Sequence, residues 1–142
     1  MSHANPSDAE LKQLLTDATV IAMVGASSNP EKTSNGIMRK LQSVGYRVIP
    51  VNPRETEVLG ERAYPSLVDV PERIDIVDVF RRAEDTPPIA DEAVTIGAKA
   101  LWLQTGIVSE DAAARAKAGG LMVVMDLCIG ATHSLLRIPR KP

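Results

Sequence analysis

The sequence predicts a doubly wound α/β domain built on a parallel β-sheet. Five short apolar runs, rich in β-branched residues, begin about 21 to 28 residues apart, which is the length of a strand–loop–helix unit. The runs are apolar almost throughout rather than alternating, which is typical of strands buried on both faces of a parallel sheet. The five predicted strands are Val20–Val24, Arg47–Val51, Ile74–Phe80, Ala100–Gln104 and Leu121–Asp126.

Helices are expected before the first strand and in three of the four connections. Polar caps, apolar residues at helical spacing and glycines at the far ends indicate them. A proline suits the first turn of the third helix, and two acidic residues follow the cap of the fourth. The expected helices run from Ser7 to Thr16, from Ser34 to Gly45, from Asp85 or Thr86 to Gly97, and from Ser109 to Gly119–Gly120.

The connection formed by residues 53–73 is the exception. It contains Gly60, Pro65 and Pro71, which interrupt a helical pattern. We therefore expect a turn there, with at most a short helix near Ser66–Asp69.

The composition is that of a single globular domain over residues 1–142. Hydrophobic residues make up 44% and charged residues 24%, and the net charge of −2 gives no electrostatic case for nucleic acid or a membrane surface. The single cysteine excludes an internal disulfide. No signal peptide and no run near the roughly 18 apolar residues of a membrane span is evident, so a cytoplasmic protein is expected. Residues 1–18 should form a helix packed outside the sheet, and residues 129–142 a C-terminal tail.

The segment after the first strand predicts a phosphate site. The apolar run ends at a glycine, a loop of small polar residues follows, and a helix begins near Ser34. Backbone amides of such a loop and the positive end of the helix both favour an anion. The candidate residues are Gly25, Ala26, Ser27, Ser28 and Lys32. Only Gly25 precedes Gly36, so the G-x-G-x-x-G spacing of ordinary NAD sites is absent. The alternative is a tight turn without a ligand.

The second strand is followed by Asn52, Pro53 and Arg54. An NAD site usually carries a carboxylate here, which accepts a hydrogen bond from the ribose. An arginine instead suits a phosphate on the ribose, as in NADP or coenzyme A. The alternative is a solvated arginine in a turn that starts at Pro53.

The third strand ends in Val79, Phe80 and Arg81. Phe80 is a candidate to cover a ring or a pantetheine-like chain, and Arg81 is a candidate to meet a phosphate. Alternatively, Phe80 belongs to the core and Arg81 is solvated. Because parallel strands end at one edge of the sheet, Lys32, Arg54 and Arg81 are expected to converge there. In a chain of net negative charge, that convergence is the stronger argument for an anionic ligand.

The last two strands add a small turn, Gln104 to Gly106, and a thiol, Cys128. The turn either exposes backbone to a ligand or is a plain connection. Cys128 either faces the cleft and meets a thiol-bearing ligand or is inert and half-buried. Cys128 and His133 lack an obvious third group to orient them as nucleophile and base. No metal-ligand pattern is present and Asp78 has no assignable acid–base role, so no catalytic or metal-binding residue is predicted.

Five segments of the chain carry a family resemblance. They are Val24–Met38 (VGASSNPEKTSNGIM), Tyr46–Pro53 (YRVIPVNP), Val58–Arg82 (VLGERAYPSLVDVPERIDIVDVFRR), Ile96–Ile107 (IGAKALWLQTGI) and Gly120–Cys128 (GLMVVMDLC). In this order and spacing, over nearly the whole chain, they resemble the small stand-alone CoA-binding proteins. The domain of these proteins is similar to the CoA-binding domain of the succinyl-CoA synthetase α subunit. The proline that often follows the cysteine in that family is absent here.

The resemblance implies a five-stranded Rossmann-like domain that binds coenzyme A at its strand ends. Gly25–Ser28 would hold phosphate, and Asn52–Arg54 would flank the adenosine part. Val79–Arg81 would line the adenine or pantetheine path, with Gln104–Gly106 beside it. Cys128 matches a cysteine often found after the last strand of the family. Ligase activity is not expected, because the second domain that carries the phosphohistidine chemistry of the synthetase is not matched.

Three functions follow from these observations. The first is non-catalytic binding of coenzyme A or an acyl-CoA. The second is an NADP-dependent oxidoreductase, since Arg54 also suits a 2′-phosphate. The third is a regulatory subunit that binds no ligand. The sequence indicates neither a protein partner nor an acyl group.

Overall fold

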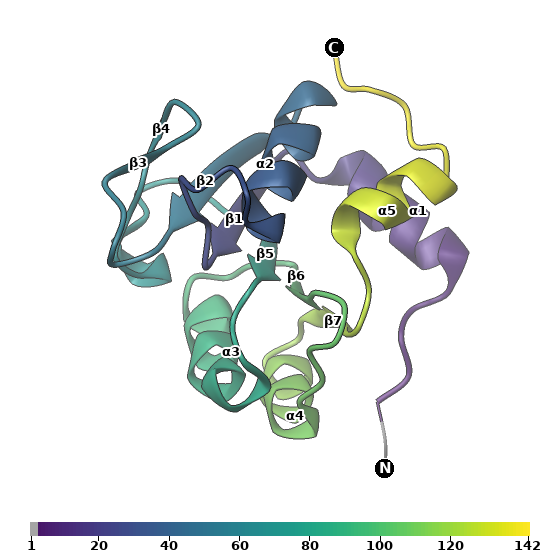
Figure 1. The fold of residues 1–142 in the computed structure, drawn as a ribbon. Helices are drawn as coiled ribbons and strands as arrows, with labels where there is room; N and C mark the ends of the chain where they lie inside the picture. Colours follow the sequence, from purple (N-terminus) through teal and green to yellow (C-terminus); the bar gives the residue numbers. More distant parts are fainter. Residues whose placement is uncertain (1–2) are drawn as a thin grey trace.

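A computed structural model describes residues 3–142 of the chain. Within this range five parallel strands form one sheet in the spatial order β2-β1-β5-β6-β7, as Figure 1 shows. The chain leaves β1 toward β2 on one side and returns to β5 on the other, so the strand order reverses beside β1. The doubly wound, Rossmann-like prediction is therefore confirmed. The strands are β1 (Val20–Val24), β2 (Arg47–Val51), β5 (Ile76–Val79), β6 (Ala100–Leu103) and β7 (Met122–Val124).

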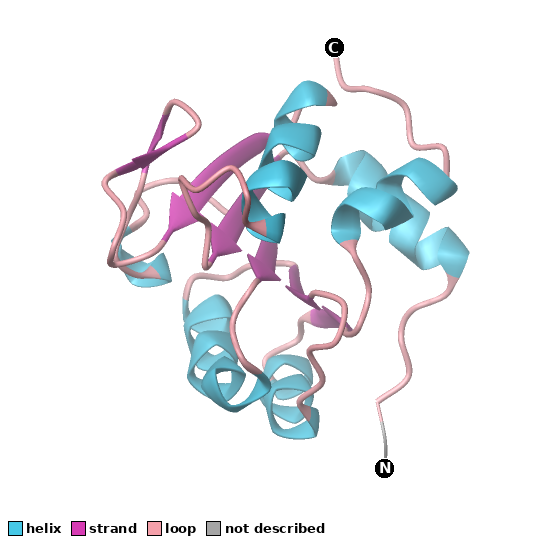
Figure 2. Cartoon of the chain, in the orientation of Figure 1, coloured by secondary structure: helices cyan, strands magenta, loops and turns pink. Residues whose placement is uncertain are grey.

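Helices cover both faces of the sheet in the described chain, and alternate residues of each strand face one layer or the other. On one face, Met23 and Trp102 pack with residues of α1, α2 and α5. On the other face, Val77 and Leu101 pack with residues of α3 and α4. Figure 2 shows the two helical layers with the sheet between them. The helices are α1 (Asp8–Asp17), α2 (Thr33–Ser43), α3 (Thr86–Thr95), α4 (Glu110–Ala118) and α5 (Ile129–Leu135).

Side-chain caps are present at two helices, including the one predicted at Ser109, and the cap predicted at Ser34 is absent. Ser7 and Ser109 each accept a hydrogen bond from the N–H three residues further on, at 3.2 and 3.1 Å. Ser34 is not a cap, which corrects the prediction: Lys32 occupies the N-cap of α2 and makes no side-chain hydrogen bond there. The first turn of α2 is therefore left without a side-chain cap.

Two elements go beyond the sequence prediction. In the connection formed by residues 53–73, β3 (Glu57–Val58) and β4 (Glu61–Arg62) pair as a short antiparallel hairpin. A single 3-10 turn, Leu67–Asp69, follows where a short helix was expected. The other addition is α5, which gives regular structure to the first half of the expected C-terminal tail.

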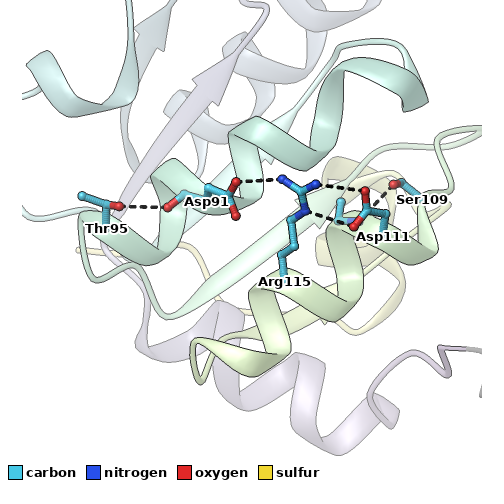
Figure 3. A network of polar contacts seen from close by, with 6 residues as sticks. Asp91, Thr95, Ser109, Asp111 and Arg115 are labelled. Atoms are coloured by element: carbon cyan, nitrogen blue, oxygen red, sulfur yellow. Dashed lines mark hydrogen bonds and ion pairs between the residues drawn. The ribbon is translucent and has the colours of Figure 1, made fainter.

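A charged network joins the two helices of one layer. Arg115 on α4 pairs with Asp91 on α3 at 2.8 Å and with Asp111 on its own helix at 3.0 Å. Figure 3 shows the guanidinium held between the two carboxylates. All three side chains are between 41% and 60% exposed, so water screens these ion pairs.

Candidate functional site

The ends of β1, β2 and β5 enclose a cavity of about 630 Å³, at the point where the strand order reverses. We refer to it as the first cavity. Its wall combines residues that follow each of these strands with the first residues of α2. The lining residues are Gly25, Ser27, Lys32, Thr33, Ser34, Asn52, Pro53, Arg54, Phe80 and Arg81. Ligands of open α/β sheets bind at this position.

The turn after β1 requires glycine at position 25. Gly25 has a φ of +90°, and a Cβ there would overlap the carbonyl oxygen of Phe80. The N–H of Gly25 donates to the carbonyl of Val51 at 2.9 Å, and the N–H of Phe80 donates to the carbonyl of Val24 at 2.8 Å. The turn is therefore fastened to the strands on both sides of β1.

Two asparagines hold the loop that follows Gly25. Nδ2 of Asn52 donates to the carbonyl of Ala26 at 2.8 Å, and Nδ2 of Asn35 donates to the carbonyl of Ser27 at 2.9 Å. Oδ1 of Asn52 also accepts the N–H of Arg54 at 2.9 Å. Both loop carbonyls are thus engaged by side chains, so Asn52 lines the cavity but uses its polar atoms to position the loop.

Three cationic side chains line the first cavity, and one of them, Arg81, also pairs with Asp85 at 3.8 Å. Lys32, Arg54 and Arg81 line it from three different connections, and none of the described residues in its wall is a carboxylate. The open N-terminus of α2, which begins at Thr33, adds free N–H groups and the positive end of the helix dipole. The structure therefore brings the three predicted cations together in a cavity that suits phosphate groups.

A second cavity, of about 360 Å³, continues the first along the strand ends toward α5. Thr33, Phe80 and Arg81 line both cavities, so the two lie next to each other. The rest of the second wall comes from α2, from the turn after β6 and from the start of α5. These residues are Ile37, Gln104, Thr105, Ile107 and Cys128. The second cavity is therefore less charged than the first.

A third cavity, also of about 360 Å³, opens on the other side of Pro53 and Arg81, next to α3. Its wall includes Glu84, Asp85 and Glu92. These carboxylates make it unsuited to phosphate, so the anionic part of a ligand is directed to the first cavity.

A buried polar pair reaches from the sheet to the second cavity. Asp78 in β5 is fully buried, and Gln104, after β6, is 4% exposed. Nε2 of Gln104 donates to Oδ1 of Asp78, whereas Oδ2 of Asp78 and Oε1 of Gln104 have no partner among the described residues. Burial raises the pKa of Asp78 to about 8, although the hydrogen bond from Gln104 opposes this. Asp78 is therefore mostly neutral at pH 7.

Four predicted site residues do not line the first or the second cavity. Ala26 and Val79 are fully buried in the two apolar layers. Ser28 donates its N–H and its hydroxyl to the carboxylate of Glu55, at 2.6 and 2.9 Å. The N–H of Gly106 donates to an aspartate side chain after β7 at 2.6 Å. Ala26 and Val79 therefore belong to the apolar layers, whereas Ser28 and Gly106 are exposed and hold loops at the strand ends.

Several wall residues were missed by the sequence analysis. Thr33 and Ser34 line the first cavity, and Ile37 and Ile107 line the second. Thr33 and Ser34 start a helix directly after the loop predicted to bind phosphate, and this position indicates that they could line the site. The sequence analysis instead assigned Ser34 to a helix cap. The two isoleucines fall in no pattern that separates a cavity wall from a core.

Cys128 and His133 have different surroundings although both belong to the α5 segment. Cys128 lines the second cavity, and its Sγ accepts the N–H of Ala131 at 3.5 Å. His133 is buried against Tyr46, with the ring centroids 5.8 Å apart and the rings nearly perpendicular. Burial, together with nearby lysine charges, lowers the pKa of His133. No hydrogen bond joins the two side chains in the described chain.

Two further features are absent from residues 3–142. No cluster of three or more His, Cys, Asp or Glu side chains is placed to hold a metal ion. None of the helices combines the length and the apolar character that a membrane crossing demands.

The fold and the first cavity define a class: a Rossmann-like α/β domain with an anion-suited cavity at its strand ends. The family model described as "CoA binding domain" matches residues 19–134. The chain therefore belongs to the CoA-binding domain family.

Similar proteins fall into two groups: proteins of about the same length as this chain, and a much longer ligase that matches it over one segment. YneT of Bacillus subtilis, an uncharacterized protein, is 43% identical over 133 residues, which are 94% of this chain and 98% of that protein. The structure of a hypothetical protein from Pyrococcus horikoshii OT3 has a TM-score of 0.91 and 36% identity, and covers 96% of this chain and 99% of that one. The ADP-forming acetate–CoA ligase of Methanocaldococcus jannaschii is 30% identical over 103 residues. That match covers 72% of this chain but only 14% of the ligase.

Proposed function

We propose that this chain binds coenzyme A or an acyl-CoA at the strand ends and does not itself catalyse a reaction. The first cavity carries the proposal, because Lys32, Arg54 and Arg81 meet the open N-terminus of α2 there. Coenzyme A has a diphosphate and a 3′-phosphate, which are the groups that arginine, lysine and helix N-termini bind well. The family of the chain supports the same ligand.

The adjacency of the two cavities supports an extended ligand. The phosphates would lie in the first cavity against the Gly25–Ser27 loop, with Asn52–Arg54 beside the adenosine. The pantetheine arm would pass Phe80 and Arg81, which line both cavities, into the second. Ile37 and Ile107 give that second wall the apolar surface that an uncharged arm requires.

A binding role without catalysis is supported by the extent of the similarity. The aligned region is 14% of the Methanocaldococcus jannaschii ligase, so the activity of that enzyme is not carried over to this chain. The separation of Cys128 from the buried His133 also argues against a nucleophile–base pair.

Isothermal titration calorimetry with coenzyme A, dephospho-CoA, NADP and AMP tests the proposal. We expect coenzyme A to bind more tightly than dephospho-CoA and AMP. Arg54→Gln should weaken coenzyme A binding about 10- to 100-fold, the size of one charge-assisted hydrogen bond. Arg62→Gln on β4 is the matched control, because it removes the same charge from a residue outside the cavities. Coenzyme A binding no tighter than AMP would overturn the proposal.

The NADP titration addresses a second candidate, an NADP-dependent oxidoreductase. Arg54 favours it, since an arginine beside the ribose also suits a 2′-phosphate. Binding of NADP but not of coenzyme A would establish this alternative. No heat with any of the four compounds would instead favour a regulatory subunit that binds no ligand.

A further inference from the structure

The second cavity contains the only thiol of the chain. The sequence has a single cysteine, Cys128, which is partly exposed and lines this cavity. A cysteine alone does not make a site, but its position matters when the ligand proposed for the neighbouring cavity itself ends in a thiol.

Gln104 independently indicates that the second cavity receives a polar chain. Gln104 lines the cavity and is 4% exposed, and its buried Oε1 has no hydrogen-bond partner in the described structure. A buried polar atom without a partner is costly, so such atoms in native proteins call for an explanation. The pantetheine arm carries two amide N–H groups, either of which supplies the missing donor.

The path to Cys128 begins at the first cavity. Thr33, Phe80 and Arg81 line both cavities, so a ligand held by its phosphates at Lys32 and Arg54 would extend past Phe80 into the second cavity. Cys128 lies at the α5 side of this route. A thiol-ended arm directed along it would bring two sulfur atoms into one small volume.

We propose that Cys128 is a site of covalent modification by coenzyme A, formed by thiol–disulfide exchange with coenzyme A disulfide. This inference rests on the proposed function. The thiolate Sγ of Cys128 attacks one sulfur of the disulfide, and a new S–S bond forms as the old one breaks. The second coenzyme A leaves as a thiolate and takes up the proton released from Cys128. The disulfide is the oxidant, and an excess of a dithiol reverses the reaction and releases coenzyme A.

Intact-mass spectrometry after incubation with coenzyme A disulfide tests this inference. We expect one adduct on the wild type and none on Cys128→Ser, which excludes bound but unreacted ligand. Binding of the nucleotide part in the first cavity should make the reaction with coenzyme A disulfide ~100-fold faster than with glutathione disulfide, which has no nucleotide part. Adenosine 3′,5′-bisphosphate should slow the reaction with coenzyme A disulfide only, and Arg54→Gln should do the same. Arg62→Gln should leave both rates unchanged.

Calorimetry with reduced coenzyme A in the presence of a phosphine reductant tests the proposed binding function separately from the modification of Cys128. Binding of reduced coenzyme A without an adduct from the disulfide would overturn the inference and leave the proposed function intact. Equal rates with both disulfides, insensitive to the bisphosphate, would also overturn it, because Cys128 would then be an ordinary accessible thiol. Failure of reduced coenzyme A to bind would overturn the proposed function together with the inference.

Discussion

Asp78→Asn should change how the stability of this protein depends on pH. The carboxyl is fully buried, and burial raises its pKa to about 8, with the hydrogen bond from Gln104 opposing the shift. In the unfolded chain an aspartate titrates near pH 3.9. Between these two values the folded state holds one proton more than the unfolded state. The contribution of Asp78 is therefore fully present below about pH 4 and is lost as the pH rises toward 8.

The size of the effect follows from the two pKa values. One pKa unit corresponds to about 1.4 kcal/mol, so wild type should lose about 4 kcal/mol relative to Asp78→Asn between pH 4 and pH 7. A typical domain has a free energy of unfolding of only about 5–15 kcal/mol, so this change is large. Asparagine keeps an acceptor oxygen for Gln104 and cannot ionise, which makes it the appropriate replacement.

Urea unfolding at pH 4, 5.5, 7 and 8.5 measures the effect. The single tryptophan, Trp102, is fully buried and lies opposite Asp78 on the neighbouring strand, so its fluorescence reports unfolding. Because the substitution is next to this probe, the transition should also be followed by far-UV circular dichroism. Asp75→Asn is the control of opposite sign. Burial alone would raise the pKa of Asp75, but hydrogen bonds from Thr19 and Val20 and the charge of Lys99 lower it. Wild type should therefore lose its advantage over Asp75→Asn as the pH falls. A wild-type minus Asp78→Asn difference that is constant across the four pH values would refute the reasoning.

Two further substitutions test the turn after β1 and the ion pairs between α3 and α4. Gly25→Ala should destabilise the fold by about 2 kcal/mol or more, because it strains a positive φ and forces a Cβ into the carbonyl of Phe80. Urea unfolding measures this loss, and an unchanged midpoint would show that the turn adjusts without cost. Arg115→Ala should leave the thermal midpoint within about 2 °C of wild type, because the ion pairs in Figure 3 are exposed and screened. A larger loss in calorimetric melting would mean that the network between α3 and α4 acts cooperatively.

The strands and the cationic wall were predictable because they depend on local pattern and on one topological rule. Each strand is a short, mainly apolar run, and the first two are followed directly by Gly25 and Asn52. Parallel strands end at one edge, so Lys32, Arg54 and Arg81 could be placed together without any knowledge of side-chain packing. The switch point beside β1 then located the first cavity.

The hairpin and α5 were not predictable from local pattern, because tertiary contacts hold them. Val58 is buried although β3 and β4 have two residues each, and the pairing of Tyr64 with Val51 ties the hairpin to the sheet. α5 has seven residues and contains Gly130, which lies against α2. A Cβ at Gly130 would make ordinary contact with the side chain of Lys40, at 3.6 Å. A helix this short is marginal in isolation, so its sequence carries little signal.

The second cavity was the least predictable part of the site, and the reason lies in strand alternation. Val79 was expected along the ligand path, but the side chains of adjacent residues in β5 face opposite layers. Val79 therefore packs with α3 and α4, whereas Phe80 reaches both cavities. A one-residue difference in position along the chain decides which of two neighbours lines a cavity.

Asp78 links the stability of the sheet to that second cavity. An apolar side chain at this central position would avoid the desolvation of a carboxyl and the unpartnered Oδ2. The chain instead keeps a polar pair whose other member, Gln104, forms part of the cavity wall. Departures from good packing concentrate at functional sites, where they are retained for what they position. The pH dependence of the stability difference between wild type and Asp78→Asn therefore measures what burying this carboxyl beside Gln104 costs the fold. If that cost is absent, the pair is ordinary packing and no longer supports the second cavity as a binding site.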